Sequence, residues 1–466
     1  MGKTINTPRS FWLTILTFTL IVNLTMMRSI YLRLGELKAN LMHSTWSGML
    51  LLCFGIAITC IWLMFRKPKN QILAEDLLAS FDNLAWRVLG ALIFLVILFL
   101  IPYAKFTFQI GQEVKTPIYD PVLLLLFYYW MCWWLCLLAM IVLKVALRTT
   151  WLSGFVTALL LLGVTYEVIS RFNVVTNYPL SLGWSEGSRY YYASLYFSKW
   201  IYGQRFPLST LHPTRYLLQS IPFLFPGLGL FAQRLWQYLL WIGLASGTAI
   251  ALTQRVFTQQ ERFIKWLVAG WLFLYLLRVG VYYHLEVMVI VPVLFVSGRH
   301  SWRSLVAVII ASVWAGMSRV NWFPMPAMIA IVLYLLETPI SSIDSETRNF
   351  SFKQITSYLS LPFVWGVVGL GSALLTQIAY IPISGNAENT GAFTSSFTSD
   401  LLWYRLWPNA NFTLGIIPAI LIVSGPLIAI VFLATRQWKS LHVIRWLGLI
   451  GMLLALFVGS AVVSTK

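Results

Sequence analysis

The sequence is short of acidic side chains and of cysteine, and each shortage excludes a class of protein. Asp and Glu number 15 against 33 Lys and Arg, and all charged residues make up only 10% of the 466 residues. A water-soluble protein needs more charge to cover its surface. The 4 cysteines fall inside apolar runs, form no CxxC pair and have no histidine nearby. They therefore indicate small buried hydrophobes and not a zinc site.

Nucleotide-binding motifs are also missing. The chain has no GxxxxGK[ST] sequence and no GxGxxG after a strand, so a nucleotide-dependent reaction finds no support. The formal net charge of +18 does not indicate nucleic acid either, because the basic residues lie in short clusters between apolar runs. Such clusters set membrane topology and contact anionic lipid headgroups. An energy-rich substrate would have to arrive already attached to lipid.

Long apolar runs dominate what is present. Hydrophobic residues make up 59% of the chain and the mean hydropathy is +0.77. Runs of about 17–25 apolar residues are the length that a helix needs to cross a bilayer. The sequence predicts an all-α polytopic membrane protein with about 13 transmembrane helices. They lie near 11–27, 45–65, 86–104, 121–143, 151–169, 235–253, 264–280, 285–297, 304–317, 322–336, 356–382, 413–434 and 443–463.

Basic clusters predict the orientation of these helices. Lys3 and Arg9 precede the first run, 66-RKPK-69 follows the second, and Arg255 and Arg262 follow the sixth. Because Lys and Arg collect on the cytoplasmic side, the N-terminus should be cytoplasmic. Arg28 follows the first run where a signal peptide would have a small-residue cleavage site, so we expect an uncleaved first helix. The protein is expected in the cell (plasma) membrane.

Two polar segments, near 170–234 and 383–412, should then be extracytoplasmic. We expect a four-helix extension over 1–150 and a core over 151–466 that carries both segments. The first segment crowds eight aromatic residues into 184–202, which is typical of a membrane–water interface. The sequence from Glu186 to Tyr202 suits an interfacial helix lying along the surface. Pro222 and Pro226 interrupt the apolar stretch that follows, which favours a surface helix or a shallow dip.

This segment resembles the opening loop of the C-type glycosyltransferase superfamily. The residues that carry the resemblance are 184-WSEGSRYYYAS-194, Pro207, His212-Pro213, Arg234 and 254-QRVF-257. The family shows W-x-D-E-x-x-Y-x-A, then G-x-x-P and H-P-P-L-Y, then a helix ending in R-R-L-F. The similarity covers about 165–260 and continues only as topology to about 336.

The resemblance implies transfer of a sugar from a polyprenyl-phosphate donor to a glycan or lipid acceptor on the extracytoplasmic face. In the family the acidic residue of the loop acts as base or orients the acceptor. Glu186 takes the place of the second acid of the D-E pair, and Ser185 replaces the first. If the missing acid is the base in relatives, Glu186 must substitute for it.

The chemistry of such a transfer leads to the same residues. It needs a carboxylate to take a proton from the acceptor hydroxyl and cations to stabilise the departing phosphate. Glu186 is the predicted catalytic residue, and it should converge with Arg234 and Arg319 on one outward-facing cavity. The candidate substrate-binding residues are Trp184, Arg189, Tyr190, His212, Arg234, Arg278, His284 and Arg319.

Several alternatives stay open at this stage. An interfacial Arg or Glu is often a snorkelling anchor or a member of a surface ion pair, and His212 could simply start a helix. Glu186 and His212 are potential metal ligands, but two such residues do not make a site, so no cofactor is predicted. The whole protein could instead be a non-catalytic scaffold subunit, or a transporter or flippase of lipid-linked sugars. A transporter would be expected to show inverted repeats and paired broken helices, and we detect neither.

Overall fold

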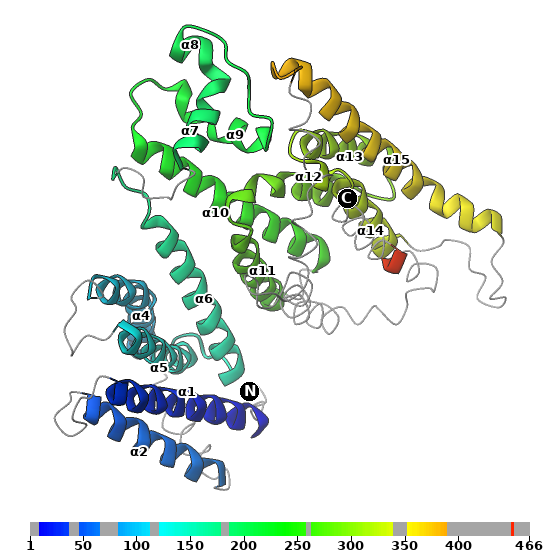
Figure 1. Ribbon diagram of the computed structural model, residues 1–466. Coiled ribbons are helices and arrows are strands. Elements are labelled where there is room, and N and C mark those ends of the chain that lie inside the picture. The colour runs from blue at the N-terminus through cyan, green and yellow to red at the C-terminus, as the bar shows by residue number, and fades with distance from the viewer. Residues whose placement is uncertain are drawn as a thin grey trace. The chain divides into compact units, whose positions relative to one another are not determined.

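The computed structural model describes residues 9–36, 46–65, 83–111, 121–178, 186–257, 262–338, 352–388 and 449–451 (Figure 1). Regular structure within these ranges is helical, without a strand. The all-α prediction is therefore confirmed for the described residues. They divide into two compact units, Met1–Arg171 and Phe172–Lys466. The boundary expected at residue 150 stays a prediction.

Seven of the described helices are long and apolar enough to cross a membrane. Large apolar side chains on them are exposed: Leu51 is 73% exposed and Phe363 72%. Exposure of such apolar surfaces to water is unfavourable, whereas contact with lipid tails is not. The chain is an integral membrane protein. Four further apolar helices are shorter, and most of 413–463 lies outside the described residues, so the total of 13 stays a prediction.

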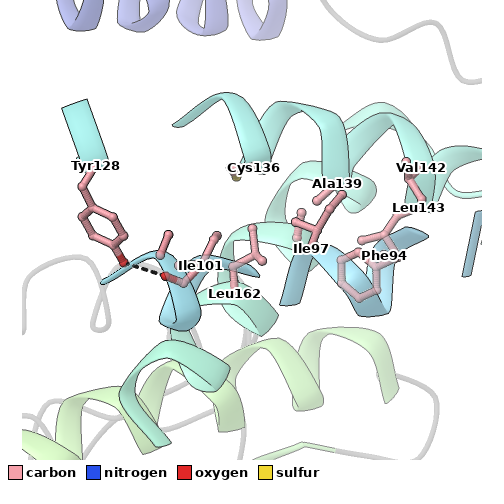
Figure 2. Packing of buried hydrophobic residues seen from close by; sticks show 11 residues of the cluster. Phe94, Ile97, Ile101, Tyr128, Cys136, Ala139, Val142, Leu143 and Leu162 are labelled. Carbon is pink, nitrogen blue, oxygen red and sulfur yellow. Dashed lines mark hydrogen bonds between the residues drawn. The ribbon is translucent and has the colours of Figure 1, made fainter. Parts of the chain in front are cut away.

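The first unit contains five long helices. They are α1 (Arg9–Glu36), α2 (Trp46–Phe65), α4 (Leu84–Gly111), α5 (Pro121–Leu147) and α6 (Trp151–Phe172). Aliphatic and aromatic side chains of α4, α5 and α6 form a buried cluster that includes Phe94, Ile97 and Leu162 (Figure 2). The Tyr128 hydroxyl donates to the carbonyl oxygen of Ile101 at 3.3 Å, which gives this phenol a partner beside the apolar cluster.

Polar side chains join α1 to α5. Trp130 Nε1 donates to Asn23 Oδ1 at 3.0 Å, and Trp133 Nε1 donates to Thr19 Oγ1 at 3.1 Å. Hydrogen bonds of this kind help to associate helices in lipid. The tryptophans of α5 therefore contribute to helix packing. On α6, Arg171 Nη2 lies 3.1 Å from Glu167 Oε2 and forms an i,i+4 ion pair with it.

The second unit begins with short helices and continues with longer ones. In chain order they are α7 (Glu186–Ser194), η2 (Leu195–Phe197), α8 (Ser198–Tyr202), α9 (Pro213–Gln219), η3 (Ile221–Leu224), α10 (Leu230–Val256), α11 (Arg262–Leu276), η5 (Leu277–Glu286), α12 (Val287–Phe295), α13 (Ser301–Gly316), η6 (Val320–Trp322), α14 (Met325–Glu337) and α15 (Phe352–Ile383). The helix expected over Glu186 to Tyr202 is present, broken by one 3-10 turn. Its position along a membrane surface stays a prediction.

Arg255 fixes the far end of α10. Its guanidinium donates to the carbonyl oxygens of Val293 and Val296, the second at 2.6 Å, and so satisfies the open C-terminal end of α12. The same guanidinium pairs with both carboxylate oxygens of Glu337 on α14. Arg255, from which the sequence predicts a cytoplasmic helix end, thus also ties three helices together.

Close packing of α13 against α15 depends on Gly316, and we expect Gly316→Ala to destabilise the fold. A Cβ atom there would overlap the carbonyl oxygen of Ala373 and lie 2.9 Å from Thr376 Cβ. Overpacking of this kind costs about 1–3 kcal/mol, and a backbone obstacle cannot rotate away. The measurement is equilibrium unfolding in mixed detergent micelles.

Gly371→Ala is the matched control, because a Cβ at this position on α15 has nothing within 4 Å. Alanine is favoured over glycine inside a helix by roughly 0.5–1 kcal/mol. The control should therefore leave stability unchanged or raise it slightly. Equal behaviour of the two variants would refute the close approach of α13 and α15.

Candidate active site

The short helices α7, α8 and α9 gather at the Leu230 end of α10 (Figure 1). Their chain turns at Gly203, whose φ of +75° suits glycine, and then runs beside the end of α15. There the Tyr380 hydroxyl donates to the carbonyl oxygen of Ser209 at 2.8 Å. On the other side Trp236 Nε1 of α10 donates to the carbonyl oxygen of Leu218 at 2.8 Å. The segment is thus bonded to two long helices.

Glu186 opens α7 and pairs with Arg234 on α10. Arg234 Nε donates to Glu186 Oε1 at 2.7 Å, and Arg234 Nη2 donates to Glu186 Oε2 at 2.9 Å. Both residues are buried, and Arg234 also donates to the Thr176 carbonyl oxygen at 2.5 Å. Such two-pronged, charge-assisted contacts are strong and directional. The pair fixes the start of α7 against α10.

Tyr190 lies one helical turn beyond Glu186. Burial raises the pKa of its hydroxyl, and the nearby Glu186 carboxylate raises it further, while Arg234 acts in the opposite sense. Its hydroxyl oxygen is buried and has no hydrogen-bond partner among the described residues. Tyr190 therefore stays a neutral phenol beside the ion pair.

Buried amides lie beside the ion pair. Gln219 Nε2 on α9 donates to the Tyr283 hydroxyl at 2.7 Å and to Gln237 Oε1 at 3.2 Å. Gln237 is one turn along α10 from Arg234, so the ion pair and this network share one helix face. The Tyr283 hydroxyl is also close enough to interact with Arg189 and Arg215. The network connects the Glu186–Arg234 pair, on the acidic side of the site, to a group of basic side chains on its other side.

That basic side contains three arginines and a histidine from three segments. Burial lowers the pKa of the Arg189 guanidinium on α7, and repulsion by Arg215 on α9 lowers it further. The pKa of His212 is lowered to about 4 by burial together with repulsion from Arg215 and from Arg319, which precedes η6. Because Arg215 lowers the pKa of both Arg189 and His212, and Arg319 lowers that of His212, this region is strongly positive. We call Arg189, His212, Arg215 and Arg319 the cationic cluster.

His212 has an unusual backbone conformation. Its φ of +53° and ψ of +44° lie in the left-handed region, which a residue with a Cβ rarely adopts. Its N–H donates to the carbonyl oxygen of Ser318 at 3.2 Å, and Pro213 then starts α9. Its ring contacts those of Tyr282 and His284, with centroids 5.2 and 5.5 Å away. The hydroxyl oxygens of Thr214 and Ser318 lie 2.6 Å apart, and their hydrogen bond joins the start of α9 to the chain before η6.

The structure brings most of the predicted site residues into one region. Glu186, Arg234 and Tyr190 form its acidic side. His212 and Arg319 share its basic side with Arg189, and His284 is fully buried beside His212. Trp184 and the side chain of Arg278 lie outside the described residues. A common outward-facing cavity stays a prediction.

Sequence reasoning did not single out Gln219, Gln237, Tyr283 or Ser318. A signal was present for one of them, since Gln237 follows Arg234 by three residues in a largely apolar helix, and polar residues in such helices tend to face the interior of the bundle. Nothing marked Gln219 or Ser318. Among the described residues, no three His, Cys, Asp or Glu side chains are placed to share a metal ion.

Chemically, the site combines a positive region with a neutral imidazole and a neutral phenol. The positive region suits a phosphate or pyrophosphate group. The imidazole could accept a proton from a hydroxyl group. Comparison of the chain with protein-family models, with curated proteins and with solved structures gives no match.

Proposed function

We propose that this protein is an integral membrane glycosyltransferase that moves a sugar from a polyprenyl phosphate to a glycan or lipid acceptor on the extracytoplasmic face. The cationic cluster carries the proposal. Sugar transfer from a lipid phosphate leaves a phosphate behind, and its developing charge is stabilised by fixed cations. Arg189, Arg215 and Arg319 supply such charge at the end of a membrane helix, where a lipid headgroup would lie.

Burial makes this charge effective. Arg215 is 6% exposed, and its Nε has no hydrogen-bond partner among the described residues. Holding like charges together costs free energy unless an anion joins them. A bound phosphate would relieve that repulsion, so the cluster is preorganised for an anion. The resemblance of 184–257 to the C-type glycosyltransferase superfamily agrees with this assignment.

One observation favours the alternative of a non-catalytic scaffold subunit. Both carboxylate oxygens of Glu186 accept hydrogen bonds from Arg234. A carboxylate engaged in this way must break a buried contact before it can take a proton. A scaffold would need the pair only to fix α7. The role of Glu186 as catalytic base therefore stays a prediction, and activity has to decide between the two functions.

The test is transfer of radiolabelled sugar from a pool of polyprenyl-phosphate donors in proteoliposomes. We expect transfer by the wild type and equal transfer by Arg205→Gln, because Arg205 is an exposed cation in the same segment but outside the cationic cluster. Folded wild-type protein that transfers no sugar from any donor, with membrane-extract acceptors present, would sink the glycosyltransferase proposal. The scaffold function would then be preferred.

A further inference from the structure

Two independent features make His212 energetically expensive. Its left-handed backbone is strained in a residue with a Cβ. Its Nδ1 is buried without a hydrogen-bond partner among the described residues, which is a further cost to the folded state. Glycine or asparagine would avoid the first cost, and a solvent-facing ring would avoid the second. Costs of this kind persist where a side chain has a task other than stabilising the fold.

We propose that the imidazole of His212 is the group that takes the proton from the acceptor hydroxyl during sugar transfer. The inference rests on the proposed function and names its catalytic base. It follows from the geometry of the two sides of the site. The Glu186 carboxylate is bonded to Arg234, whereas His212 lies within the cationic cluster where the donor phosphate would bind.

The surroundings of His212 keep it unprotonated. Burial and the facing charged groups, Arg215 from its own segment and Arg319 before η6, together lower the pKa of its imidazole to about 4. Tyr282 and His284 of η5 contact the ring. At neutral pH the imidazole can therefore accept a proton. Phosphate bound to Arg215 and Arg319 would offset their repulsion and raise the pKa of His212 in the donor complex.

The step balances as a substitution at the anomeric carbon. The acceptor oxygen forms a bond to the anomeric carbon while its proton moves to the unprotonated ring nitrogen of His212. The bond between that carbon and the phosphate oxygen breaks, and its electron pair leaves with the polyprenyl phosphate, held by the arginines. Solvent or the departing phosphate then removes the proton from His212. No oxidant, metal or further reactant is needed.

Chemical rescue of His212→Gly tests the proposal. Glycine adopts a φ of +53° without strain, which offsets part of the cost of removing the buried ring, and it leaves a space the size of an imidazole. We expect kcat to fall by about 10²–10⁴-fold, the contribution typical of a general base. Added imidazole should restore transfer, and the rescued rate should rise with pH as imidazole loses its proton.

The control is His300→Gly, which removes an exposed histidine before α13. It should transfer sugar like the wild type and show no response to imidazole. Unchanged transfer by folded His212→Gly, or a loss that neither imidazole nor 4-methylimidazole reverses, would overturn the inference. Either result would leave the proposed function standing, because that function fails only if the wild type itself transfers nothing.

The pH dependence of kcat/KM and kcat is a second test, because a purely structural role of His212 would not affect it. For the wild type, kcat/KM should fall on the acid side near pH 4, since it reports the free enzyme, in which the pKa of His212 is about 4. The acid limb of kcat should lie at higher pH, because bound phosphate raises that pKa. Coincident limbs that persist in His212→Gly would contradict the assignment.

Discussion

Replacement of Arg234 by methionine should destabilise the protein by about 3–5 kcal/mol, the largest effect on folding that we expect from a single side chain. Methionine fills much of the same volume. It leaves the Glu186 carboxylate buried, without the two N–H groups of Arg234 that donate to it in the wild type. The Thr176 carbonyl oxygen also loses its donor. Equilibrium unfolding in mixed detergent micelles measures the change. Loss of less than about 1 kcal/mol would mean that α7 is not held by this pair.

A double-mutant cycle separates the ion pair from simple truncation. Glu186→Gln removes the negative charge and keeps the shape, so it should cost less than Arg234→Met. In the double variant Glu186→Gln/Arg234→Met no carboxylate is stranded, and its destabilisation should fall well short of the sum of the two single effects. Additive effects would indicate that Glu186 and Arg234 do not interact in the folded protein.

The sequence was sufficient to identify both members of this pair but not their contact. Both were singled out as polar residues of an aromatic, basic segment. The Arg234 guanidinium was expected to face a substrate phosphate. In the structure the Arg234 guanidinium faces Glu186, which lies 48 residues earlier in the chain, at the start of α7. A contact of that separation depends on how α9 and α10 pack, which no local pattern encodes.

The positions of the long helices followed from hydropathy, while the contacts made at their breaks did not. The runs near 45–65 and 151–169 correspond to α2 (Trp46–Phe65) and α6 (Trp151–Phe172). The gap between the expected runs near 264–280 and 285–297 falls in the 3-10 segment Leu277–Glu286, where Gly280 has a φ of +66°. That break places Tyr283 and His284 beside α9. Hydropathy thus located this break, but it could not show which side chains the break brings into contact with α9.

Removal of Arg215 should lower activity without lowering stability, whereas removal of Arg234 should lower stability. Arg215→Gln should lower kcat/KM for sugar transfer by about 10²–10³-fold, as expected when a donor aimed at developing charge is lost. Its stability should stay level or rise by up to about 1 kcal/mol, because the substitution takes one cation away from Arg189 and His212. The transfer assay and detergent unfolding, run on the same preparations, measure both quantities.

The comparison of the two arginines decides what the cationic cluster is for. Arg234 has a carboxylate partner and stabilises the fold, whereas Arg215 depresses the pKa of two neighbours and so works against it. Arg215→Lys keeps the charge without the planar fork, and should recover part of the activity but not the gain in stability. If Arg215→Gln instead unfolded the protein as Arg234→Met does, Arg215 would be a structural cation. The cationic cluster would then no longer be the proposed binding site for the phosphate of a lipid-linked donor.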